Sequence, residues 1–314
     1  MKWRPHVRLL IEHALPWLLL IVACTMVFTQ VKRPALLLSV LVPWAEVGVL
    51  AIAMTAIILT GGIDLSVGST VALCGVVVGV LWQDCGVSIE LAAMCGVTVG
   101  IAAGAFNGLL VIAGLPPLVT TLATMAFFRG LAMKISGAER VTGFPPSFTD
   151  WRLVAGQPIQ FWLLIAVAAI GVVVVHNTTF GRRCYAIGEN RLAARYAAIP
   201  VKRTDCLLYT ASGLAAGLVA VTNAARHNVA VPDAAQGIEL QAIACVVVGG
   251  TLITGGHGGV HRTLLGLAVI SLLDTGLQFL STRVSFLTAE SRLIVVGVLL
   301  ISVTVWNERV RRRA

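Results

Sequence analysis

The stretch that organises this chain covers residues 176–205 and reads HNTTFGRRCYAIGENRLAARYAAIPVKRTD. It is a basic segment in a chain that is otherwise 58% hydrophobic and only 12% charged. Soluble domains carry about 25% charged residues. A helix that crosses a membrane needs about 20 apolar residues, and apolar runs of that length lie on both sides of the stretch. The composition predicts an all-α, polytopic integral membrane protein whose chain leaves the bilayer at 176–205.

The rest of the chain divides into apolar runs separated by short turns. The predicted spans lie at about 14–30, 43–60, 66–82, 89–112, 118–136, 160–175, 206–223, 238–253, 263–281 and 288–306. We therefore expect about ten transmembrane helices, with eight as the alternative. They are expected to form a single transmembrane domain over residues 1–314. A second long loop is expected at about 137–159.

The net charge of +9 is concentrated in three segments. These are the N-terminal residues 1–12, the stretch 176–205 and the tail 308–313. In membrane proteins, Lys and Arg accumulate in cytoplasmic loops. Both termini and the 176–205 loop are therefore expected in the cytoplasm, which requires an even number of spans and places the 137–159 loop outside. This explanation of the basic patches leaves no role for a nucleic-acid partner.

A helix break is predicted at residues 59–69, which read LTGGIDLSVGS. Gly61 and Gly62 would end one helix, and Asp64 or Ser66 could cap the next by accepting hydrogen bonds from its free N–H groups. A carboxylate at membrane depth must be capped, paired or in water. Two interpretations remain open: a tight structural reversal, which the physics favours, and a site on a broken helix of the kind found in transporters.

Further polar residues interrupt the apolar spans. Such residues usually face one another or a water-filled path, although charges near span ends can extend to the membrane surface. Both explanations stay open for Lys134, Glu239 and Arg292, and Glu46 is a further charge near the start of a span. The candidates for a translocation pathway or structural motif are Gly61, Gly62, Asp64, Ser66, Asn107, Arg129 and Asp274.

Span 89–112 carries a ladder of Gly96, Gly100, Gly104 and Gly108. Glycines four residues apart form one flat helix face that lets another backbone approach closely. We expect a packing seam inside one subunit. A homodimer seam and a pore lining are the alternatives.

No catalytic constellation is present in the sequence. Residues 250–255 have the glycine spacing of a phosphate-binding loop but lack the Lys-Ser/Thr that must follow it. We therefore expect a transport protein rather than an enzyme, with no cofactor bound by this chain. Seven cysteines occur without a C-x-x-C pair, so neither a disulfide nor a metal site is expected. If transport is driven by ATP, another polypeptide must hydrolyse it.

Four segments in order along the chain, 59–69, 115–132, 180–203 and 237–258, carry a family resemblance. They read LTGGIDLSVGS, LPPLVTTLATMAFFRGLA, FGRRCYAIGENRLAARYAAIPVKR and GIELQAIACVVVGGTLITGGHG. They resemble the sugar-type permeases of bacterial binding-protein-dependent ABC importers, a group that includes ribose, arabinose, galactose, xylose, rhamnose and autoinducer-2 permeases. The loop GFPPSFTDW at 143–151 is most similar to the autoinducer-2 permeases.

The resemblance implies a multi-pass subunit of the bacterial inner membrane, surrounded by membrane lipid. Its implied partners are a second permease subunit, either a copy or a paralogue, and a periplasmic solute-binding protein that delivers a small polar solute. A cytoplasmic ABC ATPase would bind the ATP and Mg and drive alternating access. The competing hypothesis is a self-sufficient secondary transporter or channel, in which the basic loop only anchors topology. An intramembrane enzyme is a remote third hypothesis.

The resemblance also assigns ATPase coupling to the basic loop. Residues 189–199 would form a short helix in a groove of the ATPase. Leu192, Ala193 and Ala194 would form its close-packing face, and Gly181 and Gly188 would allow sharp turns. The implied coupling residues are Gly181, Arg182, Gly188, Glu189, Asn190, Ala193, Ala194, Arg195 and Ile199.

Overall fold

The computed structural model describes residues 42–150 and 156–281, with single positions between 21 and 25 and between 294 and 305. The predicted first and last spans, 14–30 and 288–306, lie outside the continuous described ranges, as do both termini. Their predicted placement therefore stays a prediction.

The described chain is almost entirely helical. Its helices are α3 (Ala45–Leu59), α4 (Val67–Gln83), α5 (Ile89–Ile112), α6 (Pro117–Ile135), α7 (Pro146–Thr149), α8 (Ile159–Val172), the π-helical turn η2 (Val173–Asn177), α9 (Thr179–Glu189), α10 (Arg191–Tyr196), α11 (Val201–His227), α12 (Ile238–Val248) and α13 (Val260–Ser281). Two two-residue strands, β1 (Val141–Thr142) and β2 (Val229–Ala230), pair antiparallel. They are the only departure from the predicted all-α class among the described elements.

Five of the described helices are long and apolar enough to cross a membrane: α5, α6, α8 continued by η2, α11 and α13. Helices α3, α4 and α12 are apolar but shorter. A multi-pass helical membrane protein is therefore confirmed, whereas the predicted count of about ten spans is not tested by the described residues. The start and end of α5 agree with the predicted span 89–112.

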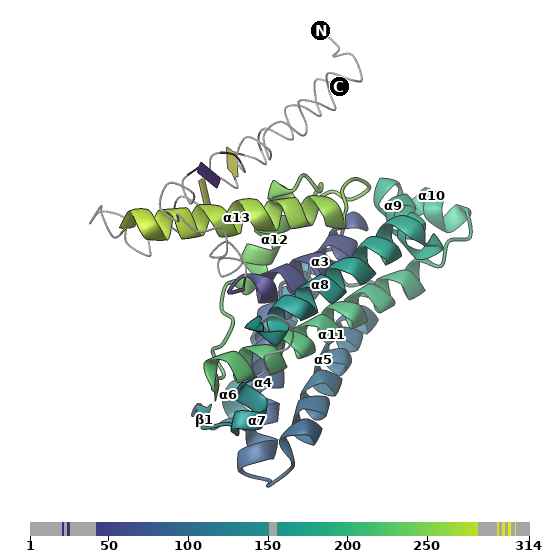
Figure 1. Cartoon of the computed structure of the whole chain (residues 1–314). Helices are drawn as coiled ribbons and strands as arrows, with labels where there is room; N and C mark the ends of the chain where they lie inside the picture. The colour runs from purple at the N-terminus through teal and green to yellow at the C-terminus, as the bar shows by residue number, and fades with distance from the viewer. Residues whose placement is uncertain are drawn as a thin grey trace.

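Helix α3 lies at the centre of the molecule. All of its residues are buried except Ala53 and Ala56, which are half-buried. It contacts α8, α11, α12 and α13, and Figure 1 shows these helices around it. A helix that is apolar on every side is stable only when it is enclosed in this way.

Helices α5 and α11 pack side by side with their backbones in contact (Figure 1). A Cβ added at Gly100 would lie 2.5 Å from the carbonyl oxygen of Gly213, and one at Gly104 would lie 2.9 Å from the Cα of Gly213. Gly108 faces Cys206 of α11 in the same way. Gly96, the fourth member of the predicted ladder, faces α4 instead. The described chain thus uses the ladder to bring its own helices together.

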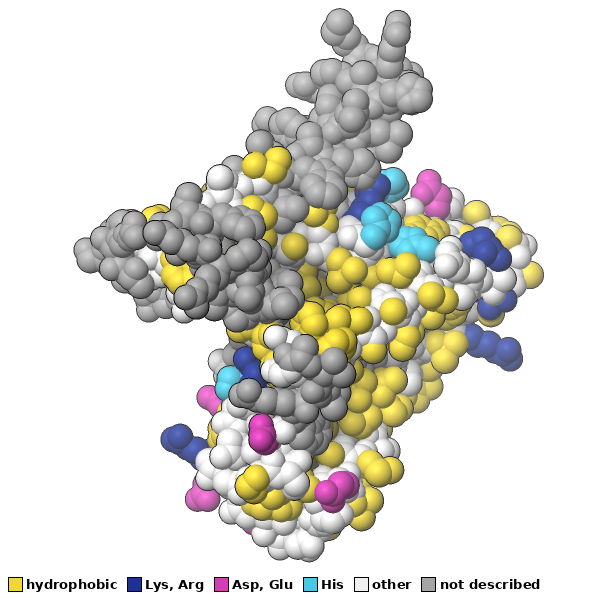
Figure 2. Space-filling model, in the orientation of Figure 1, with side chains coloured by type: hydrophobic (Ala, Val, Ile, Leu, Met, Phe, Trp, Pro, Cys, Tyr) yellow, Lys and Arg dark blue, Asp and Glu magenta, His cyan; other side chains and the backbone are white. Residues whose placement is uncertain are grey.

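Different secondary-structure elements lie at the two ends of the molecule, which are named the α10 end and the β1 end. Figure 1 shows α9 and α10 at the first, and α7 with β1 at the second. The turn between α4 and α5 belongs to the β1 end, where Trp82 stacks on Phe144 with ring centroids 5.1 Å apart. In Figure 2 hydrophobic side chains cover the middle of the face, and charged side chains lie toward the two ends. This is the distribution expected of a bilayer-spanning protein.

Candidate functional site

The predicted coupling helix is present but shorter than expected. Asn190 takes an extended backbone (φ −156°, ψ 102°), and its Oδ1 accepts hydrogen bonds from the N–H groups of Leu192 (3.1 Å) and Ala193 (2.9 Å). This cap starts α10 at Arg191 and separates it from α9, which ends at Glu189. The predicted helix over 189–199 is corrected to Arg191–Tyr196 because Asn190 interrupts it.

The predicted glycine turns are wrong. Gly181 and Gly188 both lie inside α9, and neither has a positive φ. Their lack of a side chain serves close packing instead. A Cβ at Gly181 would collide with the carbonyl oxygen of Val175, and a Cβ at Gly188 with that of Leu59. These two glycines therefore hold α9 against the preceding turn and against the end of α3.

The predicted coupling residues on and beside α9 and α10 differ in their exposure to solvent. Those that are exposed are Arg182, Glu189, Asn190, Ala193 and Arg195. Ala194 is buried against Ile187 and Val201, with Ile199 half-buried beside them. The expectation that Ala194 presents a close-packing face to a partner is corrected, because that methyl group fixes α10 to its own chain.

Two apolar side chains of α10 are strongly exposed: Leu192, which was expected on the close-packing face, and Tyr196, which the sequence did not single out. Leu192 is 61% exposed and Tyr196 is 84% exposed. They are four residues apart, so they lie on the same face of the helix. Arg191, at the start of α10, forms an ion pair with Asp205 of α11, whose side chain is 5% exposed. The helix that carries Leu192 and Tyr196 is thus tied to a membrane-crossing helix.

The α9–α10 segment rests directly on the end of the central helix α3. The carbonyl oxygen of Leu59 accepts a hydrogen bond from the N–H of Gly256 at 2.9 Å, and Gly188 approaches the same oxygen. Gly61, at the following turn, has φ +78° and lies against the backbone of Thr254. Three segments distant in sequence therefore meet, backbone to backbone, where α3 ends.

The break between α3 and α4 holds a buried polar network. Asp64 is 2% exposed, and its Oδ1 accepts from the backbone N–H (3.0 Å) and hydroxyl (2.7 Å) of Ser66. Its Oδ2 accepts from the hydroxyl of Ser212 on α11 at 2.9 Å. Asn107 of α5 donates to the Ser66 hydroxyl at 2.7 Å. The network holds α4, α5 and α11 together, which agrees with a structural reversal stabilised by hydrogen bonds.

The other pathway candidates have separate surroundings. Arg129 on α6 donates from Nη1 to the carbonyl oxygens of Pro232 (2.9 Å) and Ala234 (2.7 Å), so it fixes the loop before α12. Asp274 is half-buried on α13, a helix that packs against α3, α8 and α12. The structure therefore joins Asp64, Ser66 and Asn107 in one network and leaves Arg129 and Asp274 outside it.

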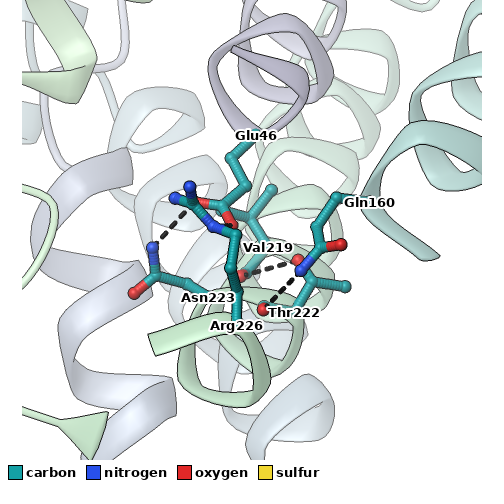
Figure 3. Close-up of polar contacts among 6 residues, drawn as sticks. All are labelled: Glu46, Gln160, Val219, Thr222, Asn223 and Arg226. Carbon is teal, nitrogen blue, oxygen red and sulfur yellow. Dashed lines mark hydrogen bonds and ion pairs between the residues drawn. The ribbon is translucent and has the colours of Figure 1, made fainter. Parts of the chain in front are cut away.

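A second polar cluster, toward the β1 end, was not predicted as a site (Figure 3). Glu46, in the first turn of α3, is 3% exposed. Arg226, in the last turn of α11, donates to both of its oxygens at 3.1 Å, and Asn223 donates to Oε2 at 2.7 Å. Nearby, the side chain of Gln160 on α8 donates to the carbonyl oxygen of Thr222 at 3.1 Å. The signal available in the sequence was a single charge at the edge of each of two apolar helices.

Comparison with known proteins gives the family. Residues 36–304 match the family described as branched-chain amino acid transport system / permease component. The autoinducer 2 import system permease protein LsrD of Yersinia enterocolitica is 37% identical over 268 residues, which is 82% of this chain and 79% of the relative. The proteins of the same name from Yersinia pseudotuberculosis and Yersinia pestis are 35% identical over the same shares. No solved structure matches the chain at a significant level.

Proposed function

The chain belongs to the family of branched-chain amino acid transport system permease components, as a multi-pass protein of the inner membrane, and from this we propose its function. It is the membrane-spanning subunit of an ATP-driven importer that moves a sugar or sugar-like solute by alternating access. A separate cytoplasmic ABC ATPase hydrolyses the ATP, a periplasmic binding protein delivers the solute, and a second permease subunit completes the pathway.

The observation that carries this proposal is the exposed surface of α9 and α10. Leu192 and Tyr196 form an apolar knob on a capped, ion-paired helix, with Arg195 exposed beside them. In a loop with an excess of basic residues, such a knob is suited to insertion into a groove of a cytoplasmic protein, since helix-in-groove binding uses apolar anchors at i and i+4. A loop that only anchors topology needs charge and has no need of an exposed Leu and Tyr.

The junction at Leu59 gives this surface a physical route to the membrane interior. Gly188 and the N–H of Gly256 meet the Leu59 carbonyl oxygen, five residues before Asp64. A displacement of α9 by a bound ATPase would press on the end of α3 at that point. The helix break could respond, because its glycines permit backbone conformations that other residues resist.

The solute is proposed from the relatives. Those named above are autoinducer 2 import permeases, so autoinducer 2 is the first solute to test, followed by pentoses, hexoses and rhamnose. Residues 250–255 lack the Lys-Ser/Thr of a phosphate-binding loop, which supports an ATPase on another chain.

The docking proposal is tested by Leu192→Asp, which places a charge on the apolar knob. We expect co-purification with the cognate ATPase to fall at least tenfold and solute uptake to be lost, while the permease still inserts in the membrane. Thr179→Asp is the matched control, because Thr179 is exposed on the same segment at the start of α9. Unchanged complex formation with Leu192→Asp, or equal losses in both variants, would contradict the docking role.

The energy source is tested in whole cells. Uptake that stops on ATP depletion and persists when the proton gradient is dissipated agrees with the proposal. The opposite pattern would favour the secondary transporter.

A further inference from the structure

Two imidazole rings meet at the α10 end of the molecule. His176 belongs to η2, and His261 is the second residue of α13. The Nε2 of His176 and the Nδ1 of His261 are 3.2 Å apart, and the ring centroids are 4.9 Å apart. His176 is half-buried and His261 is exposed, so the pair is accessible from solvent. Figure 2 shows histidine side chains gathered at this part of the surface.

The backbone beneath the pair leaves room for both rings. A Cβ added at Gly259 would lie 2.5 Å from the Cε1 of His176 and 3.1 Å from the Cε1 of His261. A side chain at position 259 would therefore push the imidazoles apart. The N–H of Gly259 is held by the hydroxyl of Thr251 at 3.3 Å, which fixes this position. The close approach of the two rings therefore depends on the absence of a side chain at Gly259.

The element that presents His176 is unusual in itself. Between α8 and α9 the chain forms the π-helical turn η2, and π-helical turns occur often at functional sites. The extra residue in such a turn changes the direction in which the following side chains point.

We propose that His176 and His261 form a binding site for a transition-metal ion such as Cu²⁺ or Zn²⁺. Zinc–nitrogen bonds of about 2.0–2.1 Å in tetrahedral geometry hold two nitrogens about 3.3 Å apart, close to the separation seen here. In the metal-free protein the two nitrogens share a hydrogen bond, so one of them carries a proton. Metal binding would replace this hydrogen bond: the proton moves to the other nitrogen of its ring, and both facing nitrogens present lone pairs to the ion. Water supplies the remaining ligands.

The site is open and exchangeable. Among the described residues, no group of three or more His, Cys, Asp or Glu side chains is placed to hold a metal ion. Two imidazoles without a third protein ligand bind less tightly than a closed structural zinc site. Cu²⁺ is expected to bind more tightly than Zn²⁺ or Ni²⁺, following the general order of affinities. The bound ion would bridge η2 and α13, so it would restrain the start of α13. This proposal is independent of the transport function.

The test is electron paramagnetic resonance of the purified, tag-free protein in detergent with one equivalent of Cu²⁺. Hyperfine coupling to two imidazole nitrogens is expected. His176→Gln and His261→Gln should each remove one nitrogen from the pattern and weaken Cu²⁺ binding at least tenfold, and Zn²⁺ in excess should displace the copper. His227→Gln is the matched control, because His227 lies at the end of α11 far along the chain from both rings.

Gly259→Ala gives a second test that keeps both histidines. It should weaken Cu²⁺ binding by separating the rings. A wild-type spectrum without two imidazole nitrogens would overturn the proposal whatever the variants do. Binding that is equal in the wild type, His176→Gln and His261→Gln would also overturn it.

Discussion

At the scale of single residues, the Glu46 carboxylate depends on one guanidinium. Removing one partner of a fully buried ion pair costs about 3–5 kcal/mol. The cost here is expected to be smaller, because the Arg226 side chain is 28% exposed and Asn223 also donates to the carboxylate. Arg226→Leu is therefore expected to lower the thermal unfolding midpoint of the purified protein, with Asn223 still donating to the carboxylate.

The double variant Glu46→Leu/Arg226→Leu is the informative control. It removes the uncompensated charge, so it should unfold at a higher temperature than Arg226→Leu alone. If the double variant is the less stable of the two, the pair does not act as a compensated buried charge.

The thiol of Cys184 in α9 is expected to be chemically silent. Burial, with a smaller contribution from Asp205, raises its pKa from 9.0 to about 12. The thiolate is the reactive form, so at pH 8 a maleimide should label Cys184 more than a hundredfold more slowly than a free thiol in the unfolded protein. Rapid labelling of the folded protein at pH 8 would contradict the burial.

The same shift predicts a pH dependence of stability. The folded state disfavours the Cys184 thiolate relative to the unfolded state. The protonated thiol therefore contributes its full share to the free energy of unfolding below the ordinary thiol pKa, and this contribution is lost as the pH rises from 9 toward 12. Cys184→Ala should flatten this alkaline loss of stability, as measured by unfolding midpoints at pH 8 and pH 11. An alkaline slope that is unchanged in Cys184→Ala would assign the loss to other groups.

Contacts within one segment could be predicted from the sequence, whereas contacts between distant segments could not. The Asp64–Ser66 segment could be predicted as a reversal, because paired glycines followed by Asp and Ser favour a turn. The predicted cap on α4 is not formed: the Ser66 side chain makes no cap hydrogen bond, and Asp64 accepts from Ser66 itself. That Ser212 completes the network could not be predicted, since it comes from α11, far along the chain. Ala194 was expected to face a partner, but its contacts with Ile187 and Val201 depend on how α10 folds back.

At the scale of helices, the seam between α5 and α11 is sensitive to volume. Gly104→Ala should reduce the yield of folded protein, and Gly104→Leu should reduce it further, because added atoms meet the backbone of α11 at Tyr209 and Gly213. Gly130→Ala in α6 is the matched control, since a Cβ there meets nothing within 4 Å. Its expected effect is neutral or slightly stabilising, as Ala favours helix over Gly.

The folded yield of each variant is measured by size-exclusion chromatography in detergent. Equal yields of Gly104→Leu and Gly130→Ala would remove the seam as an explanation for the glycine ladder.

Helix ends were predictable where local sequence sets them. The limits of α5 follow from flanking turns and agree with the prediction. Helix α11 was predicted at 206–223 but spans Val201–His227. Its first turn carries Lys202 and Arg203, which indicated a loop by hydropathy alone. The helix tolerates Asp205 there because Arg191 of α10 compensates it, a tertiary contact absent from any local pattern.

At the scale of the whole molecule, the β1 end is predicted outside and the α10 end inside. In a background without other thiols, Cys85, which is exposed in the turn after α4, should react with a membrane-impermeant maleimide in spheroplasts. A cysteine in place of Tyr196 should react only in inverted vesicles. Labelling of both cysteines from the same side would contradict the predicted topology.

The continuous backbone contact between α5 and α11 has a mechanical consequence. The backbones of the two helices approach so closely that a Cβ at Gly100, Gly104 or Gly213 would meet the facing backbone, and close approach of this kind gains van der Waals contact. Because interiors are close-packed, the two helices cannot move closer together or admit a side chain between them without a collision. A hinge for motion of the described helices is therefore expected outside this pair. The break at Gly61 and Gly62 is the expected hinge, because glycine adopts backbone conformations that other residues resist.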